Sequence, residues 1–164
     1  MRNYVVAYII NSNEYRVKFV IAEDSIQACT KVIPGFQKLL DYVRQHYSSL
    51  DYETIIRHRQ LINLIDFDVL EVDSLSEHGN IKTQIVVCYD TNRNTLSIVK
   101  HSENRKLDAL AVTIMNCGYY TEEMENLRQY NNIRQMILVF AHLSGIRVYT
   151  VSTLRALVKE SLNN

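Results

Sequence analysis

The sequence predicts an α+β fold, with an N-terminal β-hairpin and helices, a small mostly antiparallel sheet, and a helical C-terminal part. Three observations support this class. Hydrophobicity alternates with a period of two near the N-terminus, a helical block interrupts the strand patterns, and only helical patterns follow Glu103. We therefore expect a mixed α/β part over residues 1–102 and a helical part over residues 103–164, which together are short enough to form one compact domain.

The N-terminal residues predict a β-hairpin followed by a capped helix. Residues 3–10 are almost entirely apolar, residues 14–22 alternate, and the turn-forming residues 11–13 separate the two segments. Asp24 followed by Gln27 has the spacing of a capping box, so a helix is expected to begin there. This helix must end before Pro34, because the residue preceding a proline disfavours helical geometry.

The remaining elements follow from changes in hydrophobic period. Helices are predicted over residues 36–46 and from a cap near Asp51, and strands over residues 66–72, 81–89 and 95–100. The helical patterns after them cover residues 106–117, 121–130, 132–144 and 152–162. No internal repeat is visible in the sequence.

The overall composition argues against general attraction to nucleic acid. The chain has 18 basic and 18 acidic residues, so its net charge is zero and DNA binding would need a local basic patch. With only 4 glycines and 1 proline among 164 residues, the chain lacks the composition of long flexible linkers and of turn-rich sandwich folds.

The cysteines and the apolar segments predict a cytoplasmic protein. Three cysteines stand far apart without any CxxC pair, which is typical of reduced thiols. The N-terminus has no pattern of a secretion signal, and no run approaches the roughly 20 apolar residues of a membrane span. We expect no membrane association.

Residues 137–158, ILVFAHLSGIRVYTVSTLRALV, resemble a helix-turn-helix. Ala141 would let two helices approach, Gly145 would form the turn, and Val151 and Leu154 would pack a second helix against the first. The outward side chains of that second helix and of the turn before it are the types that contact bases and phosphates. They are Arg147, Tyr149, Ser152, Thr153, Arg155 and Lys159. This interpretation predicts a DNA-binding regulator acting as a homodimer on two half-sites.

A second interpretation of the same segment gives another function. Residues 147–151 alternate β-branched and polar side chains, which also predicts a strand between two helices. A strand at these positions would remove the support for DNA binding. The protein is then expected to be a small inhibitor or adaptor that binds another protein through a tyrosine-rich surface or a strand edge. The content of Asn, Ile and Tyr resembles that of phage and mobile-element accessory proteins, which act on host proteins.

An acidic run over residues 66–77 raises the alternative of a metal-dependent nuclease. Asp66 and Asp68 would lie on one face of a strand and could hold a hard cation. The spacing that would place a lysine after the strand carboxylates is absent, and Lys82 belongs to the following strand. Charges that protect a sheet edge from pairing explain the run more simply.

A nucleophilic site is the last candidate. Cys88, Asp90 and His101 would approach one another if their strands pair, and a thiol beside an imidazole is a known nucleophile arrangement. Cys88 stands in an apolar run, however, where a buried unreactive thiol is the usual state. The five histidines show no metal-ligand spacing with the cysteines, so we expect no metal or cofactor and a non-catalytic protein.

Overall fold

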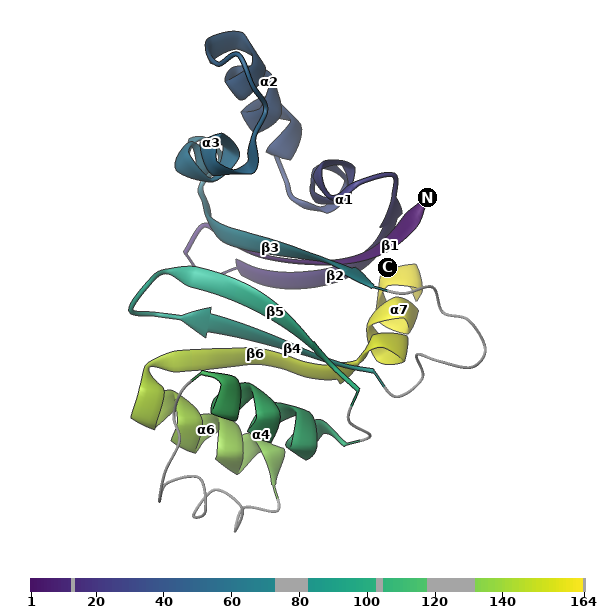
Figure 1. Ribbon diagram of the computed structural model, residues 1–164, viewed down its shortest axis with the longest axis vertical. Coiled ribbons are helices and arrows are strands. Elements are labelled where there is room, and N and C mark those ends of the chain that lie inside the picture. Colours follow the sequence, from purple (N-terminus) through teal and green to yellow (C-terminus); the bar gives the residue numbers. More distant parts are fainter. Residues whose placement is uncertain (13, 73–82, 103–104, 118–131, 164) are drawn as a thin grey trace. The chain divides into compact units, whose positions relative to one another are not determined.

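The computed structural model describes residues 1–12, 14–72, 83–102, 105–117 and 132–163. The chain divides into two compact units, Met1–Ser74 and Leu75–Asn164, and each contains a small antiparallel sheet with helices (Figure 1). The predicted α+β class is confirmed. The division lies near residue 74 rather than at the expected 102/103, because the strands before residue 102 pair with a strand from the C-terminal part.

The first unit contains a three-stranded sheet in the order β2-β1-β3. β1 (Arg2–Ile10) and β2 (Glu14–Ala22) form the predicted hairpin, and β3 (Leu64–Val72) pairs antiparallel with the other side of β1. The hairpin turns at Asn11 and Ser12, whose φ angles of 52° and 68° lie in the left-handed region. Alternate β1 residues, Tyr4, Val6 and Tyr8, face the helices of this unit and join their apolar core.

Four helical segments connect β2 to β3. They are α1 (Ser25–Val32), α2 (Phe36–His46), α3 (Tyr52–Arg57) and the short 3-10 helix η1 (Arg59–Ile62). The predicted cap of α1 is confirmed, since the Asp24 carboxylate accepts the Gln27 N–H at 2.8 Å. α1 packs on the sheet, whereas α2 packs mainly against α1, α3 and η1. Phe36 at the start of α2 and Tyr52 of α3 both contact Phe67 of β3, whereas the C-terminal end of α2 extends away from the strands (Figure 1).

The second unit contains a sheet in the order β5-β4-β6. Its strands are β4 (Gln84–Asp90), β5 (Thr95–His101) and β6 (Ile146–Thr153), and its described helices are α4 (Lys106–Asn116), α6 (Ile133–Ser144) and α7 (Leu154–Asn163). α4 and α6 cover one sheet face, where Val86 and Cys88 meet Leu110 and Phe140 in the core. The helix predicted over residues 121–130 lies outside the described residues.

The two units share one chain path. In the described residues of each unit, a hairpin is followed by helices and then by a third strand that pairs antiparallel with the first strand of the hairpin. In the second unit α7 follows this third strand. The first strand of each hairpin is thus the central strand of its sheet. The structure reveals a repeat of topology that the sequence analysis did not find.

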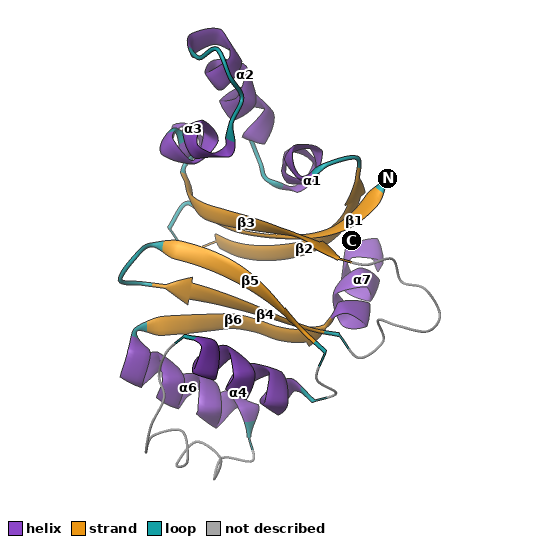
Figure 2. Cartoon of the chain, viewed as in Figure 1, coloured by secondary structure: helices purple, strands orange, loops and turns teal. Residues whose placement is uncertain are grey.

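The helix-turn-helix prediction for residues 137–158 is wrong, and the alternative strand is confirmed. α6 ends at Gly145, and the chain then continues as β6 between α6 and α7 (Figure 2). Val151 pairs with Val86 and Thr150 with Val87, so β-branched residues complete the sheet instead of forming a second helix. The C-terminal part is consequently mixed rather than purely helical.

Candidate binding surface on the α2–α3 connection

The predicted DNA-binding residues on β6 do not lie on a helix. Arg147 is exposed near the start of β6, and the Tyr149 ring contacts Tyr89 with centroids 6.1 Å apart. Ser152 and Thr153 stand at the other end of the strand, where the Thr153 hydroxyl accepts the Ala156 N–H at 3.1 Å and caps α7. Thr153 therefore has a structural role in starting α7.

The two remaining predicted residues, Arg155 and Lys159, are exposed and one turn apart on α7. Seven strand steps of about 3.3 Å place Arg147 about 23 Å from Leu154, the first residue of this helix. The structure thus separates the basic residues that a recognition helix would have gathered.

The acidic run lies partly on β3, which is an edge strand as the simpler explanation expected. Asp66 and Asp68 share one sheet face, opposite Ile9 and Ala7, but Asp66 is buried rather than solvated. Glu71 forms an ion pair with Arg2 at 3.2 Å. Within the part of the chain that the structure describes, no group of three His, Cys, Asp or Glu residues could hold a metal ion. Positions 73–82, including Lys82, lie outside the described residues.

The structure does not bring Cys88 and His101 together. Cys88 pairs with Ser97, while His101 pairs with Gln84, four strand steps or about 13 Å away. Burial raises the pKa of the Cys88 thiol to about 12, so the thiolate needed for nucleophilic attack is not formed near neutral pH.

Asp90 and His101 instead have separate structural partners. The Asp90 carboxylate accepts the backbone N–H groups of Asn92 and Arg93 in the β4–β5 turn. The Nε2 atom of His101 lies 2.7 Å from the Thr113 hydroxyl in the interior of the second unit. Beside His101 on the neighbouring strand, the buried Gln84 Oε1 has no hydrogen-bond partner among the described residues.

A cluster of aromatic and polar side chains lies where α2 ends and α3 ends. We call this the Tyr–His surface and define it by Tyr42, His46, Tyr47 and His58. Tyr42 and His46 occupy positions i and i+4 of α2, and their rings stack with centroids 4.1 Å apart. Tyr47 follows the last residue of α2, and His58 follows the last residue of α3. Two helix ends therefore present these four rings together.

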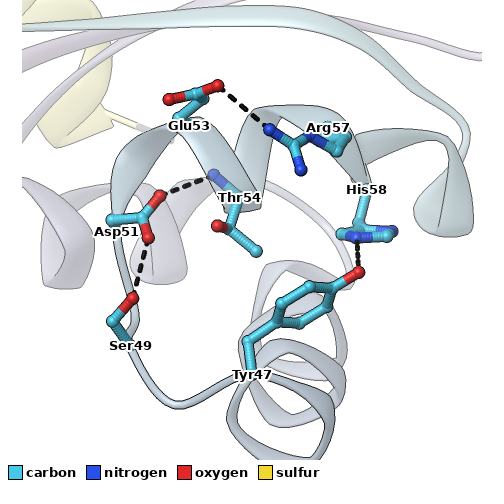
Figure 3. A network of polar contacts seen from close by, with 7 residues as sticks. All are labelled: Tyr47, Ser49, Asp51, Glu53, Thr54, Arg57 and His58. Carbon is cyan, nitrogen blue, oxygen red and sulfur yellow. Dashed lines mark hydrogen bonds and ion pairs between the residues drawn. The ribbon is translucent and has the colours of Figure 1, made fainter.

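Tyr47 and His58 are joined by a short hydrogen bond. The Tyr47 Oη and His58 Nε2 atoms lie 2.6 Å apart, and the two rings contact each other with centroids 5.1 Å apart (Figure 3). The Tyr42 ring also contacts His58, at 5.3 Å. In one neutral tautomer of His58 the phenol donates to Nε2, and in the other Nε2–H donates to the phenol oxygen.

The connection between α2 and α3 is held by the Asp51 carboxylate. It accepts the Thr54 N–H at 2.8 Å, which caps α3 as predicted, and the Ser49 hydroxyl at 2.9 Å (Figure 3). These hydrogen bonds, the Thr54 N–H first, lower the pKa of Asp51. The loop that carries Tyr47 toward His58 is thereby fixed at its far end.

Arg59 supports the other side of the Tyr–His surface. Its guanidinium donates to the backbone carbonyls of Ile56 at 2.8 Å and Ile65 at 2.5 Å. These bonds connect the end of α3 to the beginning of β3, so the backbone around His58 is held at two points. These bonds fix the position of His58 within the fold.

Two exposed ion pairs flank the surface. Arg57 meets Glu53 at 3.0 Å, and Arg44 meets Asp41 at 3.6 Å, with more than half of each side chain accessible to solvent. Exposed pairs of this kind contribute little to stability, so either guanidinium can exchange its partner at small cost. The surface combines rigid aromatic rings with cations that are able to turn outward.

The sequence predicts a tyrosine-rich binding surface without locating it. The local signals for the Tyr–His surface are the i, i+4 spacing of Tyr42 and His46 and the cap at Asp51. The contact between Tyr47 and His58 depends on the path of the loop between α2 and α3, and hydrophobic periodicity in the sequence does not predict that path.

None of the helices in the described ranges combines the length and apolar character needed to cross a membrane. No protein-family model, curated protein sequence or solved structure matches this chain.

Proposed function

We propose that this chain is a non-catalytic adaptor or inhibitor that binds another protein through the Tyr–His surface. The observation that carries the proposal is the packed ring cluster on exposed helix ends, joined by the 2.6 Å bond between Tyr47 and His58. Tyrosine is enriched at protein interfaces because one ring supplies both apolar area and a hydrogen-bonding hydroxyl. Rings that are already ordered lose little conformational freedom on binding.

The exposure of the cluster favours a contact role over a packing role. Tyr47 remains 38% exposed, and His46 is also exposed, although both have ring or hydrogen-bond partners. A tyrosine that served only to fill the core would be covered, as Tyr4 and Tyr8 are. Tyr47 and His46 are therefore the residues we assign to the centre of the contact.

A copurification experiment tests this function. The tagged full-length chain is recovered from cells that encode it, beside a Tyr47→Ala/His58→Ala variant and a Leu162→Ala control. Leu162 is 75% exposed on α7 of the second unit and gives a loss of exposed apolar surface at a residue that does not belong to the Tyr–His surface. The intact chain and the control should retain one partner protein in near-equal amount, and the double variant should lose at least about nine-tenths of it. Retention by the double variant, or the absence of any partner, would contradict the proposal. Thermal melting verifies that all three proteins are folded.

DNA binding through Arg147, Arg155 and Lys159 is the second function to be tested. Its support is reduced to the exposed basic pair on α7, because β6 replaces the recognition helix. A homodimer was expected because helix-turn-helix proteins bind two DNA half-sites as dimers. Without the motif, this reason for expecting a homodimer no longer applies.

A further inference from the structure

We propose that the second unit binds one internal water molecule, held between the Gln84 side-chain oxygen and the Thr153 hydroxyl where α7 begins. This water satisfies an amide oxygen that the fold buries without a donor from the described side chains and backbone. The inference concerns the interior of the second unit and is independent of the protein-binding function proposed for the Tyr–His surface.

The Gln84 side chain is buried between the second sheet and its helices. Gln84 is the first residue of β4, and only 1% of its surface is exposed. Val86 and Cys88 lie two and four positions later on the same face of the strand, and both pack in the core formed with α4 and α6. The Gln84 amide therefore points to the face of the sheet that these helices cover.

The Gln84 Oε1 atom has no hydrogen-bond partner within the part of the chain that the structure describes. A buried amide oxygen of this kind is unfavourable, because folding removes its hydrogen bonds to solvent and gives none in return. Native proteins satisfy such atoms with a donor of the chain or with a bound water. The donors around Gln84 decide between these two solutions.

Gln84 lies in the middle of a row of three polar residues that crosses the sheet. His101 of β5 and Thr153 of β6 both pair with Gln84, so the three side chains share one face. On the β5 side, His101 Nε2 lies 2.7 Å from the Thr113 hydroxyl, which donates to the Ala109 carbonyl at 2.9 Å. Since a hydroxyl has one proton, Thr113 has none to give to Gln84.

The Thr153 hydroxyl provides the polar group on the β6 side. Its oxygen accepts the Ala156 N–H at 3.1 Å in the cap of α7, which uses a lone pair and not the hydroxyl proton. The Leu154 N–H donates to the Thr83 carbonyl at 2.8 Å, which makes the neighbouring pair, Gln84 and Thr153, a non-hydrogen-bonded pair. Side chains approach each other most closely in such pairs, yet no direct bond joins Thr153 to Gln84 Oε1.

A water molecule matches both sides of this pair. It donates to Gln84 Oε1 and accepts from the Thr153 hydroxyl, and two bonds lie within the range found for buried waters. An ammonium ion donates to an amide oxygen but has no lone pair with which to accept from a hydroxyl. A chloride ion accepts from a hydroxyl but has no proton to donate. The required combination of donor and acceptor therefore selects water over a small ion.

Oxygen-17 magnetic relaxation dispersion of the solvent tests the site in the full-length chain. This method detects waters that remain bound for longer than the protein takes to tumble, and exchanging hydroxyl protons do not contribute to the signal. Globular proteins hold about one buried water per 27 residues, so 164 residues correspond to about six. Gln84→Met removes the polar atoms from a side chain of similar length and should lower the dispersion amplitude by about one-sixth.

Three further variants define the site. Gln135→Met makes the same substitution at an exposed position of α6 and should leave the amplitude unchanged. Thr153→Val removes the hydroxyl and should lower the amplitude as Gln84→Met does, whereas Thr153→Ser keeps the hydroxyl and should retain it. Amide NMR spectra verify that each variant is folded. If Gln84→Met does not fold, the comparison of Thr153→Val with Thr153→Ser carries the test.

Three results would overturn the proposal. An unchanged amplitude in Gln84→Met would show that no long-lived water depends on the amide. An unchanged amplitude in Thr153→Val would show that the hydroxyl does not hold the water. An equal loss in Gln135→Met would show that the change in amplitude does not come from the interior of the second unit.

Discussion

Thr91 and Gly145 are separated by 54 positions, yet the Thr91 hydroxyl donates a hydrogen bond to the Gly145 carbonyl. The Thr91 backbone N–H reaches the same oxygen at 3.3 Å. Gly145 has a φ of 70° and ends α6, so the β4–β5 turn holds the chain where it reverses into β6. The chain therefore passes from α6 into β6 at Gly145, where a helix-turn-helix would have passed into a second helix.

Gly145→Ala should destabilise the chain. A Cβ atom at this position would lie 3.1 Å from Asn92 Nδ2 and 3.3 Å from Thr91 Oγ1, and an L side chain resists the positive φ. We expect the free energy of unfolding, measured in urea, to fall by about 1–2 kcal/mol. Thr91→Val keeps the backbone donor and should cost about 1 kcal/mol. An unchanged stability of Gly145→Ala would show that the left-handed turn is unnecessary.

Thr113→Val should cost more stability than Thr113→Ser. The Thr113 hydroxyl donates to the Ala109 carbonyl at 2.9 Å, so it must accept from His101 Nε2, and both residues are buried. Valine leaves the imidazole donor without this acceptor, at a cost of about 1–3 kcal/mol. Serine keeps the hydroxyl and loses one methyl group, worth about 0.8 kcal/mol. Urea unfolding measures the stability of each variant. A Thr113→Val variant more stable than Thr113→Ser would contradict the assigned hydrogen bond.

Asp51→Asn should reduce the loss of stability in acid. The Thr54 N–H and Ser49 hydroxyl bonds lower the pKa of Asp51 in the folded chain below its unfolded value, so the charged form stabilises the fold. This contribution is present above the unfolded value of about 3.9 and is lost as the pH falls through the lower folded value. Asparagine still caps α3 but has no charge to lose. Urea midpoints measured from neutral pH down to about pH 3 should therefore decline less for Asp51→Asn. Parallel declines would contradict the assignment.

Duplex DNA should not bind this chain tightly. Its net charge is zero, and the structure separates Arg147 from the basic residues of α7. Mixed-sequence fragments at low salt are therefore expected to elute without retention on the immobilised protein. Salt-sensitive retention that disappears in Arg147→Ala/Arg155→Ala would restore DNA binding as the function.

Local chemistry made much of the fold predictable. The caps at Asp24 and Asp51 and the hairpin turn near Asn11 depend on neighbours in sequence, and the structure has all three. Residues 147–151 were ambiguous because β-branched residues after a glycine suit either a strand or a helix that follows a turn. Pairing with β4 decided between them, and that partner lies about 60 residues earlier in the chain.

The repeated topology was hidden by a shift of one residue. Val-Val-Ala-Tyr at residues 5–8 looks similar to Val-Val-Cys-Tyr at residues 86–89. In the first unit Val6 and Tyr8 face the helices, whereas in the second unit Val86 and Cys88 do. An alignment of these two similar segments would match residues that lie on opposite faces of their sheets, because side chains alternate between the two faces along a strand. The Tyr47–His58 pair was equally hidden, since it depends on a loop between two helices.

Photo-crosslinking at position 47 tests the central claim most directly. A benzophenone amino acid replaces Tyr47 in one full-length protein and Leu162 in another, and both are irradiated in cells that encode the chain. The account predicts one discrete protein adduct from position 47 and none from position 162, because Tyr47 stands at the centre of the Tyr–His surface and Leu162 is exposed on α7. An adduct from position 162 alone, or none from position 47, would contradict the assignment of the Tyr–His surface as the site of partner binding.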